Sequence, residues 1–452
     1  MGDARANLHN MQGDRLDEPS APHRVDRTAS DECWRHGVSI DVTGGTGARR
    51  LAVFYDQHSE SVLHIYQAAR PWCRILWIVG WLPGEPDYRG LSRFGDVVDV
   101  SGASEAEVVR RVAALQPEGV VVFDDLPIRI AALLAEKLGL RFHDSRSARL
   151  LTDKVAQRAA LRDAGVPVPA FAPVGRGDVN TAVPFPAVLK PRRGAGSRDT
   201  FAVASASEVA AALDVCDPSE EFVLEQWLPD RPGGDRCTSD VVSVESIVRD
   251  GDTVHVALTG RFPFAPPFRE TGSFLSCDLE ADERSEVTEL AAIASRALGL
   301  RHGVLHTEIK LTPSGARVIE VNGRLGGGIG QMIERVGGPS LRSWAVQLAL
   351  GLDVGEIPTL GSSPVAFFRW IVPPPSARRL LSVAGVEEVA ALPGVDAVRV
   401  NLRAGDSLDP RHSSQVGHVV RIDGCVNSHE ELYRLVHEQI SSVLRVEWES
   451  GG

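Results

Sequence analysis

The sequence has few cysteines, no long apolar run and no signal-peptide pattern. Its six cysteines, at positions 33, 73, 216, 237, 277 and 425, show neither CxxC spacing nor a local His/Cys cluster, which argues against a zinc site or a disulfide framework. No stretch is long and apolar enough to span a membrane, and residues 1–32 lack a hydrophobic segment. We therefore expect reduced, structural thiols in a cytoplasmic protein that does not enter a membrane.

Positive charge is also scarce. The formal net charge is −12, and the arginine pairs at 49–50, 110–111, 192–193 and 378–379 are scattered. A nucleic-acid binder needs a basic stripe, so no nucleic-acid partner is expected. Two common phosphate-binding motifs are missing as well, because GxGxxG does not follow the first predicted strand and GxxxxGK[ST] is absent. The sequence thus implies neither a dinucleotide-binding fold nor a P-loop.

What the sequence does contain is an alternation of short Val/Ile/Leu strands and Ala-rich helices, which predicts an α/β protein of several domains. Residues 1–48 are polar and are predicted to be disordered. A strand–helix rhythm over 49–148 predicts a small parallel, doubly wound domain. Residues 149–360 form the predicted main domain, and residues 361–452 a small, mostly β domain in which His412 and His418 are expected at the surface.

Residues 306–328, HTEIKLTPSGARVIEVNGRLGGG, predict a β-hairpin. A three-residue loop over 313–315 would pair Thr312 with Ala316. That register places Glu308 directly opposite Glu320, where like charges repel each other unless something positive lies between them. A slip of one residue would instead move the two glutamates to opposite faces.

Side chains alternate along a strand, so the two faces of this hairpin should differ. Two carboxylates and an amide oxygen on one face are hard ligands of the kind that Mg²⁺ takes together with phosphates. The hairpin therefore predicts a magnesium–nucleotide site, and the alternative is a solvated face with Lys310 and Arg324 as counter-ions. One face is expected to carry His306, Glu308, Lys310, Val318, Glu320 and Asn322, and the other Leu305, Ile309, Leu311, Ile319 and Val321.

A lysine next to a glycine-rich loop is a second candidate feature. Lys190 ends the predicted strand PAVLK and precedes PRRGAGSRDT. An ammonium group beside the backbone N–H groups of Gly194, Gly196 and Ser197 suits a triphosphate. An ordinary β-turn is the alternative for this loop.

Two further segments fit a nucleotide. Lys154 lies in the first turn of a helix that Thr152 or Asp153 could cap, where a phosphate would offset its unfavourable position in the helix dipole. In LEQWLPD, residues 224–230, acceptors and apolar groups meet at a strand end, as an adenine ring requires. A surface lysine and an ordinary half-buried strand are the alternatives.

Read in order, these features resemble the ATP-grasp superfamily, and within it the carboxylate–amine ligases typified by the L-amino-acid (dipeptide) ligases. The resemblance covers roughly residues 50–360 and rests on TDK, VLKPRRGAGS, LEQWLP, FRETGSF and the hairpin pattern E…E-x-N-x-R. It implies a pre-ATP-grasp domain over 49–148, an ATP-grasp domain over 149–360 with a lid at about 185–227, and a C-terminal domain over 361–452.

The resemblance also implies roles for individual residues. Lys154, Lys190 and the loop with Gly194, Gly196 and Ser197 would bind the phosphates, and Glu225, Gln226, Trp227 and Leu228 would frame adenine. Glu308, Glu320 and Asn322 would hold two Mg²⁺ ions, with Mn²⁺ as a substitute. Arg324, Lys190 and Glu270 would be the catalytic residues, and Glu270, Ser273, Arg324, Gly327 and Gly328 would line the substrate site.

Three positions depart from the family pattern. Ser273 stands where a histidine often contacts the substrate carboxylate, and Gly328 stands where some members carry a tryptophan that narrows the acyl pocket. A roomier acyl pocket is therefore expected. The usual acidic contact to the ribose is not evident in the loop 229–240, where Asp235 and Asp240 are the candidates.

The implied activity is an ATP-dependent, ADP-forming ligase that activates a carboxylate as an acyl phosphate and joins it to an amine. Its substrates would be an amino acid or related acid and a second amino acid or peptide, as in the biosynthesis of peptide natural products, with a homodimer as one assembly option. Two alternatives are a non-catalytic ATP-binding scaffold or sensor and a carboxylase-like enzyme of the same fold. Retention of both lysines, both glutamates, Asn322 and Arg324 argues against a decayed scaffold.

Overall fold

The computed structural model describes residues 49–55, 60–81, 90–176, 182–232, 237–409 and 417–451. The predicted extension over residues 1–48 lies outside these ranges, as do Asp235 and His412. Helices and strands alternate through the described residues, which confirms the predicted α/β class. None of the described helices is long and apolar enough to cross a membrane.

The N-terminal part of the described chain forms a four-stranded sheet of order β3-β2-β1-β4, and all of its strand pairs are parallel, as predicted. Strands β1, β2 and β4 are near-continuous apolar runs whose residues are mostly buried, whereas β3 (DVVD) is partly exposed, and α3 begins after the Ser104 cap. The strands are β1 (Arg50–Phe54), β2 (Arg74–Val79), β3 (Asp96–Asp99) and β4 (Gly119–Val122), and the helical segments are α2 (Val62–Ala69), η1 (Leu91–Arg93), α3 (Glu105–Ala114), α4 (Ile128–Leu138) and α5 (Ser145–Leu151).

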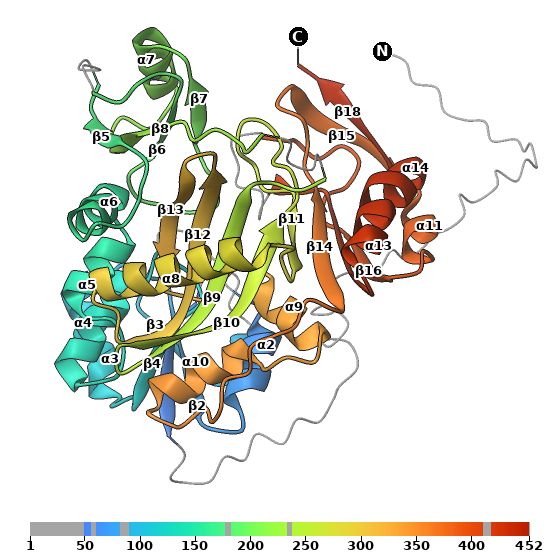
Figure 1. Cartoon of the computed structure of the whole chain (residues 1–452). Helices are drawn as coiled ribbons and strands as arrows, with labels where there is room; N and C mark the ends of the chain where they lie inside the picture. The colour runs from blue at the N-terminus through green and yellow to red at the C-terminus, as the bar shows by residue number, and fades with distance from the viewer. Residues whose placement is uncertain are drawn as a thin grey trace, which may run out of the picture. The chain divides into compact units, whose positions relative to one another are not determined.

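A second, eight-stranded sheet of order β13-β12-β9-β10-β11-β14-β17-β16 is the centre of the molecule (Figure 1). The predicted Asp250-Gly251 turn joins β9 to β10, and both turn residues have positive φ. Helix α8 lies across one face of this sheet in Figure 1 and packs on β9, β10 and β13. The elements are β9 (Val241–Arg249), β10 (Asp252–Arg261), β11 (Gly272–Leu275), β12 (His302–Thr312), β13 (Gly315–Asn322), α8 (Ala281–Ala297), α9 (Ile329–Arg335) and α10 (Leu341–Ala349).

The β12–β13 hairpin has the predicted pairing of Glu308 with Glu320, but its turn differs. Thr312 pairs with Gly315, so the loop holds two residues and not the three that we predicted. A register shift between Glu308 and Ile309 restores the alignment, because the bulged strand β13 contains one extra residue there. The predicted pairing is therefore confirmed, although the predicted loop is wrong.

The extra residue also exchanges two side chains between the faces. Val318 is fully buried in the core with Ile309, whereas Ile319 lines the large cavity described below. We predicted the reverse, since a regular hairpin would keep the strict alternation of faces. The bulge thus places an apolar side chain beside the two glutamates.

A third sheet of order β5-β8-β6-β7 lies beyond the tip of this hairpin (Figure 1). Asp153 caps helix α6, since its carboxylate accepts a hydrogen bond from Ala156 N at 3.1 Å, and Lys154 is the first residue of the helix, as predicted. Helix α7 packs on β7. The elements are β5 (Phe171–Val174), β6 (Ala187–Pro191), β7 (Phe201–Val203), β8 (Phe222–Gln226), α6 (Lys154–Asp163) and α7 (Ala206–Asp214).

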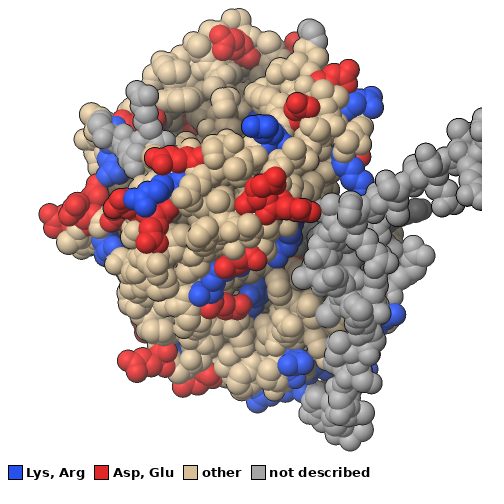
Figure 2. All heavy atoms as spheres, turned by 90° about the vertical axis from the view of Figure 1, so that its right-hand side faces the viewer, with Lys and Arg blue, Asp and Glu red and all other residues tan. Residues whose placement is uncertain are grey.

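The C-terminal residues contribute to two sheets. Strands β14, β17 and β16 extend the central sheet, while β15 and β18 pair separately. His418 is buried and stacks on Trp370 at 5.0 Å, so its predicted surface position is wrong. Figure 2 shows basic and acidic side chains interspersed on this side of the molecule. The elements are β14 (Val365–Ile371), β15 (Ala377–Ala384), α11 (Val386–Ala390), β16 (Val395–Val400), β17 (Val420–Val426), α13 (His429–Tyr433), η2 (Arg434–Ile440), α14 (Ser441–Val443) and β18 (Arg445–Ser450).

Candidate functional site

A cavity of about 650 Å³ lies between the third sheet and the β12–β13 hairpin. It is lined by every residue predicted to bind ATP and by both predicted metal-binding glutamates: Lys154, Lys190, Gly194, Gly196, Ser197, Glu225, Gln226, Trp227, Leu228, Glu308 and Glu320. A volume of this size and a mixed apolar and charged lining are typical of a small-molecule site. The remaining predicted residues, Asn322, Arg324, Glu270, Ser273, Gly327 and Gly328, do not line it.

Lys154 connects the hairpin to the glycine-rich loop. Its Nζ lies 3.1 Å from Glu320 Oε1 and donates to the Gly194 carbonyl at 2.6 Å. The loop itself needs unusual backbone angles, because Gly194 and Gly196 have φ of 119° and 68°. One ammonium group therefore contacts both structural parts expected to hold phosphate and metal.

Lys190 belongs to a buried triad. Its Nζ lies 2.8 Å from Glu225 Oε2, and Arg158 Nε lies 3.2 Å from Glu225 Oε1. Burial lowers the pKa of Lys190, although Glu225 opposes this effect. Burial alone would raise the pKa of Glu225, but Arg158 and Lys190 outweigh it and lower the pKa. The Glu225 carboxylate is thus held by two cations, which leaves Gln226, Trp227 and Leu228 for the predicted adenine contact.

Glu308 is held by a buried polar network. Its Oε1 lies 3.0 Å from Arg261 Nη2 and 3.3 Å from His306 Nε2. His306 Nδ1 lies 2.7 Å from Oε1 of Glu245, a fully buried carboxylate. Burial alone would lower the pKa of His306, but Glu245 and Glu308 raise it to about 9. His306 thus lies between Glu245 and Glu308, and Arg261 Nη2 also lies 3.0 Å from its Nε2.

The predicted substrate residues Glu270 and Ser273 lie behind this network. Arg261 Nη1 donates to Glu270, and the Ser273 hydroxyl donates to Glu270 Oε1 at 2.9 Å. Ser273 has no exposed surface, so the structure places it out of reach of a substrate carboxylate. Glu270 is half-buried and keeps an exposed edge.

Arg324 follows β13 and pairs with Asp125, which follows β4 of the first sheet. Burial alone would lower the pKa of Arg324, but Asp125 outweighs it and raises the pKa. The backbone before Arg324 is fixed by His143, whose Nε2 donates to the Gly323 carbonyl at 2.9 Å. A Cβ at Gly323 would lie 2.7 Å from His143 Nε2, so only glycine fits there.

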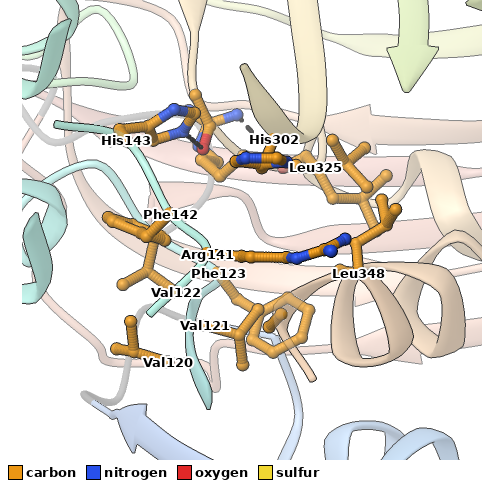
Figure 3. Close-up of a pocket in the computed structure, with 16 residues that line it drawn as sticks. Val120, Val121, Val122, Phe123, Arg141, Phe142, His143, His302, Leu325 and Leu348 are labelled. Carbon is orange, nitrogen blue, oxygen red and sulfur yellow. Dashed lines mark hydrogen bonds between the residues drawn. The ribbon is translucent and has the colours of Figure 1, made fainter. Parts of the chain in front are cut away.

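A small cavity of about 30 Å³, large enough for one water molecule, adjoins this backbone. Figure 3 shows His143, His302 and Arg141 around it, with Val120 to Phe123 along another side. It separates β4 from the Gly323–Leu325 segment. This cavity is too small for a substrate.

The predicted acyl-pocket glycines lie at the start of α9. Gly327 is exposed, and a Cβ at Gly328 would lie 2.9 Å from Phe368 Cε1 and 3.4 Å from Arg421 Nη2. Arg421 stacks over the Phe368 ring at 4.8 Å. Phe368 and Arg421 therefore take up space next to Gly328, and the roomier pocket stays a prediction.

Sequence reasoning missed several residues of this site. Asp230 lines the cavity and pairs with Lys310. The ribose candidate Asp240 lines the cavity as well, and its carboxylate accepts hydrogen bonds from Arg231 at 2.7 Å. Phe268 also lines the cavity, and its ring centroid lies 5.4 Å from that of Trp227. The alternation of Thr259 and Arg261 along one strand was a signal for a polar face, but it did not identify the partners.

The residues present fit a magnesium site that is completed by phosphate oxygens. Glu308 and Glu320 supply carboxylates. Asn322 donates a hydrogen bond from Nδ2 to the His306 carbonyl at 3.4 Å, so its Oδ1 remains to bind a cation. Among the described residues, no three His, Cys, Asp or Glu side chains form a ready metal cluster. A bound cation would therefore need the nucleotide as well as the protein.

Comparison with known proteins agrees with this geometry. Residues 183–332 match the ATP-grasp domain family. Carnosine synthase 1 of Gallus gallus is 34% identical over 200 residues, which are 40% of this chain and 20% of that protein. The L-arginine-specific L-amino acid ligase of Bacillus subtilis is 24% identical over 68% of this chain and 75% of its own. The crystal structure of the L-amino acid ligase from Bacillus licheniformis superposes with a TM-score of 0.70 at 21% identity, covering 90% of this chain and 100% of that one.

Proposed function

We propose that this chain, which contains an ATP-grasp domain, is an ATP-dependent, ADP-forming ligase that joins a carboxylate to an amine. The carboxylate would be an amino acid or related acid, activated as an acyl phosphate, and the amine a second amino acid or a peptide N-terminus. The curated relatives named above include an L-amino acid ligase and a carnosine synthase, which supports this reaction class. A role in making peptide natural products fits the same substrates.

The observation that carries the proposal is the convergence of charge on one cavity. Lys154 enters it from the start of α6 and Lys190 from β6 of the third sheet, and Glu308 and Glu320 enter it from the hairpin. Carboxylates on one wall and ammonium groups on the other suit a metal-bound triphosphate, because each group finds an opposite charge. A carboxylase-like enzyme would share this nucleotide site.

The chemical difficulty is that a carboxylate resists attack by an amine. Mg²⁺ supplies charge neutralisation at the phosphate oxygens when it is bound by Glu308, Glu320 and Asn322. Lys190 and Lys154 would bind the phosphates and orient the terminal one. Arg324, held by Asp125, would neutralise the negative charge of the substrate carboxylate or acyl phosphate. Glu270 would lie near the incoming amine.

The glycine-rich loop at 194–200 would close over the phosphates and exclude water, which would otherwise hydrolyse the activated acid. In the structure this loop is held by the Lys154 bond to the Gly194 carbonyl and by the Arg198 pair with Glu220. We further propose two bound Mg²⁺ ions that Mn²⁺ can replace, a cytoplasmic site of action and a homodimer. The two metal ions follow from the resemblance, the cytoplasmic site follows from the cysteine pattern, and the homodimer is one role for the C-terminal residues.

The test is ADP release from purified protein with Mg-ATP and a panel of amino acids, supplied singly and in pairs, with mass spectrometry of the products. The proposal expects ADP only with particular pairs, together with a condensed mass. Glu320→Ala should abolish ADP formation, whereas Glu118→Ala, an exposed glutamate outside the cavity, should not. Wild-type turnover in Glu320→Ala would contradict the metal assignment. ATP binding without ADP release for any amino-acid pair or peptide would favour the scaffold alternative.

A further inference from the structure

Resting on the proposed function, we propose that Arg261 is a positioning residue that sets the metal affinity of the cavity through the Glu308 carboxylate. Arg261 ends β10 and lies two strands away from β12, so it reaches Glu308 across β9. Its side chain is 5% exposed, and it does not line the cavity. Any effect it has on a ligand must pass through another side chain.

The Arg261 guanidinium divides its two ends between two carboxylates. Nη1 donates to Glu270 and lies 3.3 Å from the Ser273 hydroxyl. Nη2 lies 3.0 Å from Glu308 Oε1 and 3.0 Å from the Ser243 hydroxyl. A single rigid group therefore connects the predicted metal ligand with the predicted amine-side carboxylate.

This arrangement assigns different tasks to the two oxygens of Glu308. Oε1 is occupied by Arg261 and by His306, and Glu308 reaches the cavity wall. The Arg261 guanidinium donates to this oxygen at 3.0 Å, which orients the carboxylate plane and leaves Oε2 to face a cation. Without Arg261, the carboxylate could rotate, and a cation would have to order it on binding.

Arginine suits this task better than lysine does. Its planar fork can serve two acceptors at once in a fixed geometry, whereas an ammonium group is a point charge on a flexible stem. Lysine at position 261 would retain the charge but hold Glu270 or Glu308, not both. Outer-shell partners of metal ligands typically contribute about 10- to 100-fold to metal affinity, which sets the size of the expected effect.

The competing explanation is that Arg261 only stabilises a buried ion cluster. Arg342 provides a matched control for that explanation. Its side chain is 3% exposed, and it also bridges two carboxylates, with Nη1 3.0 Å from Glu60 and Nη2 on Glu334. Arg342 contacts neither the cavity nor the hairpin glutamates. A structural role predicts equal behaviour of the two arginines toward metal.

The experiment measures Mn²⁺ binding by electron paramagnetic resonance to wild type, Arg261→Lys and Arg342→Lys, each with ADP and no amino acid, so that no turnover occurs. Thermal unfolding is recorded in parallel. We expect Arg261→Lys to bind Mn²⁺ at least 10-fold more weakly than wild type. Arg342→Lys should bind it as wild type does, although both variants unfold at lower temperature.

Ser243→Ala provides a milder variant if Arg261→Lys fails to fold, because it removes one acceptor of Nη2 and leaves every charge in place. We expect a several-fold loss of Mn²⁺ affinity in this variant. Equal Mn²⁺ affinity in wild type and in the variants at Arg261 or Ser243 would overturn the role of Arg261 but leave the proposed metal site standing. A wild-type protein that binds no Mn²⁺ with ADP would overturn both the inference and the proposed metal site.

Discussion

The buried triad of Lys190, Glu225 and Arg158 makes a quantitative prediction for Glu225→Gln. Glutamine keeps the size of the side chain but removes its charge, which leaves two buried cations without a counter-charge. The Glu225 side chain is 5% exposed, and its oxygens lie 2.8 Å from Lys190 Nζ and 3.2 Å from Arg158 Nε. Breaking a buried pair by removing one partner typically costs about 3 to 5 kcal/mol.

We therefore expect Glu225→Gln to lower the free energy of unfolding by about 3 kcal/mol, measured by urea denaturation. Glu221→Gln is the control, because Glu221 is 55% exposed and pairs with Arg192 and Arg193 at the surface. An exposed pair contributes less than about 1 kcal/mol. Comparable stability of the two variants would refute the assignment of Glu225 as the charge that holds the triad together.

The same variant should change how nucleotide binding depends on pH. The pKa of Lys190 already lies below its usual value because of burial, and Glu225 is the charge that opposes this. Its removal lowers the Lys190 pKa further, so the ammonium loses its proton at a lower pH. Calorimetry of ADP binding should show affinity falling with rising pH earlier in Glu225→Gln than in wild type. Coincident pH profiles would contradict the role of Lys190 in binding phosphate.

Three more predictions concern Gly328 and Glu60. Gly328→Ala should lower the free energy of unfolding by about 1 kcal/mol or more, because Gly328 has φ of 77° and the new Cβ would meet Phe368. Gly328→Trp should change the acyl-donor profile of the enzyme. An unchanged profile would refute the pocket assignment. Burial alone would raise the pKa of Glu60, but the His64 hydrogen bond and Arg342 lower it from 4.5 to about 2. The stabilisation that Glu60 contributes is present above pH 4.5 and is lost as the pH falls toward 2. In urea denaturation at a series of pH values, Glu60→Gln should therefore lose less unfolding free energy between pH 4.5 and 2 than wild type does. An equal loss in both proteins would contradict the role of Glu60.

The hairpin shows how far sequence reasoning could go. Strand composition and a turn were enough to predict that Glu308 pairs with Glu320. However, the turn contains one residue fewer than predicted, and β13 contains one extra residue at the bulge. The two differences cancel for the glutamates but not for Val318 and Ile319. Both of these side chains are apolar, so composition alone could not show which one faces the core. Only the packing of Val318 against the core decides it.

Long-range partners were beyond the sequence for a different reason. Arg261, Asp125 and Lys154 come from three separate parts of the chain, and no local pattern states which charged partner each one meets. The same limit applies to β14, β16 and β17. Their apolar runs predict strands, but the sheet that they join is set by tertiary packing.

The counter-ions of the hairpin bear on the two interpretations of its charge. The solvated-face alternative required Lys310 and Arg324 to neutralise the glutamates, but they pair with Asp230 and Asp125. The groups that do contact Glu308 and Glu320 are Arg261, His306 and Lys154.

These contacts differ in kind. Arg261 and His306 are buried behind Glu308, where they can only hold it, whereas Lys154 enters the cavity itself. A cation arriving at Glu320 would repel the Lys154 ammonium and free it for a phosphate oxygen. The charge of the cavity would then stay balanced throughout nucleotide binding, which a solvated sheet face has no need to arrange.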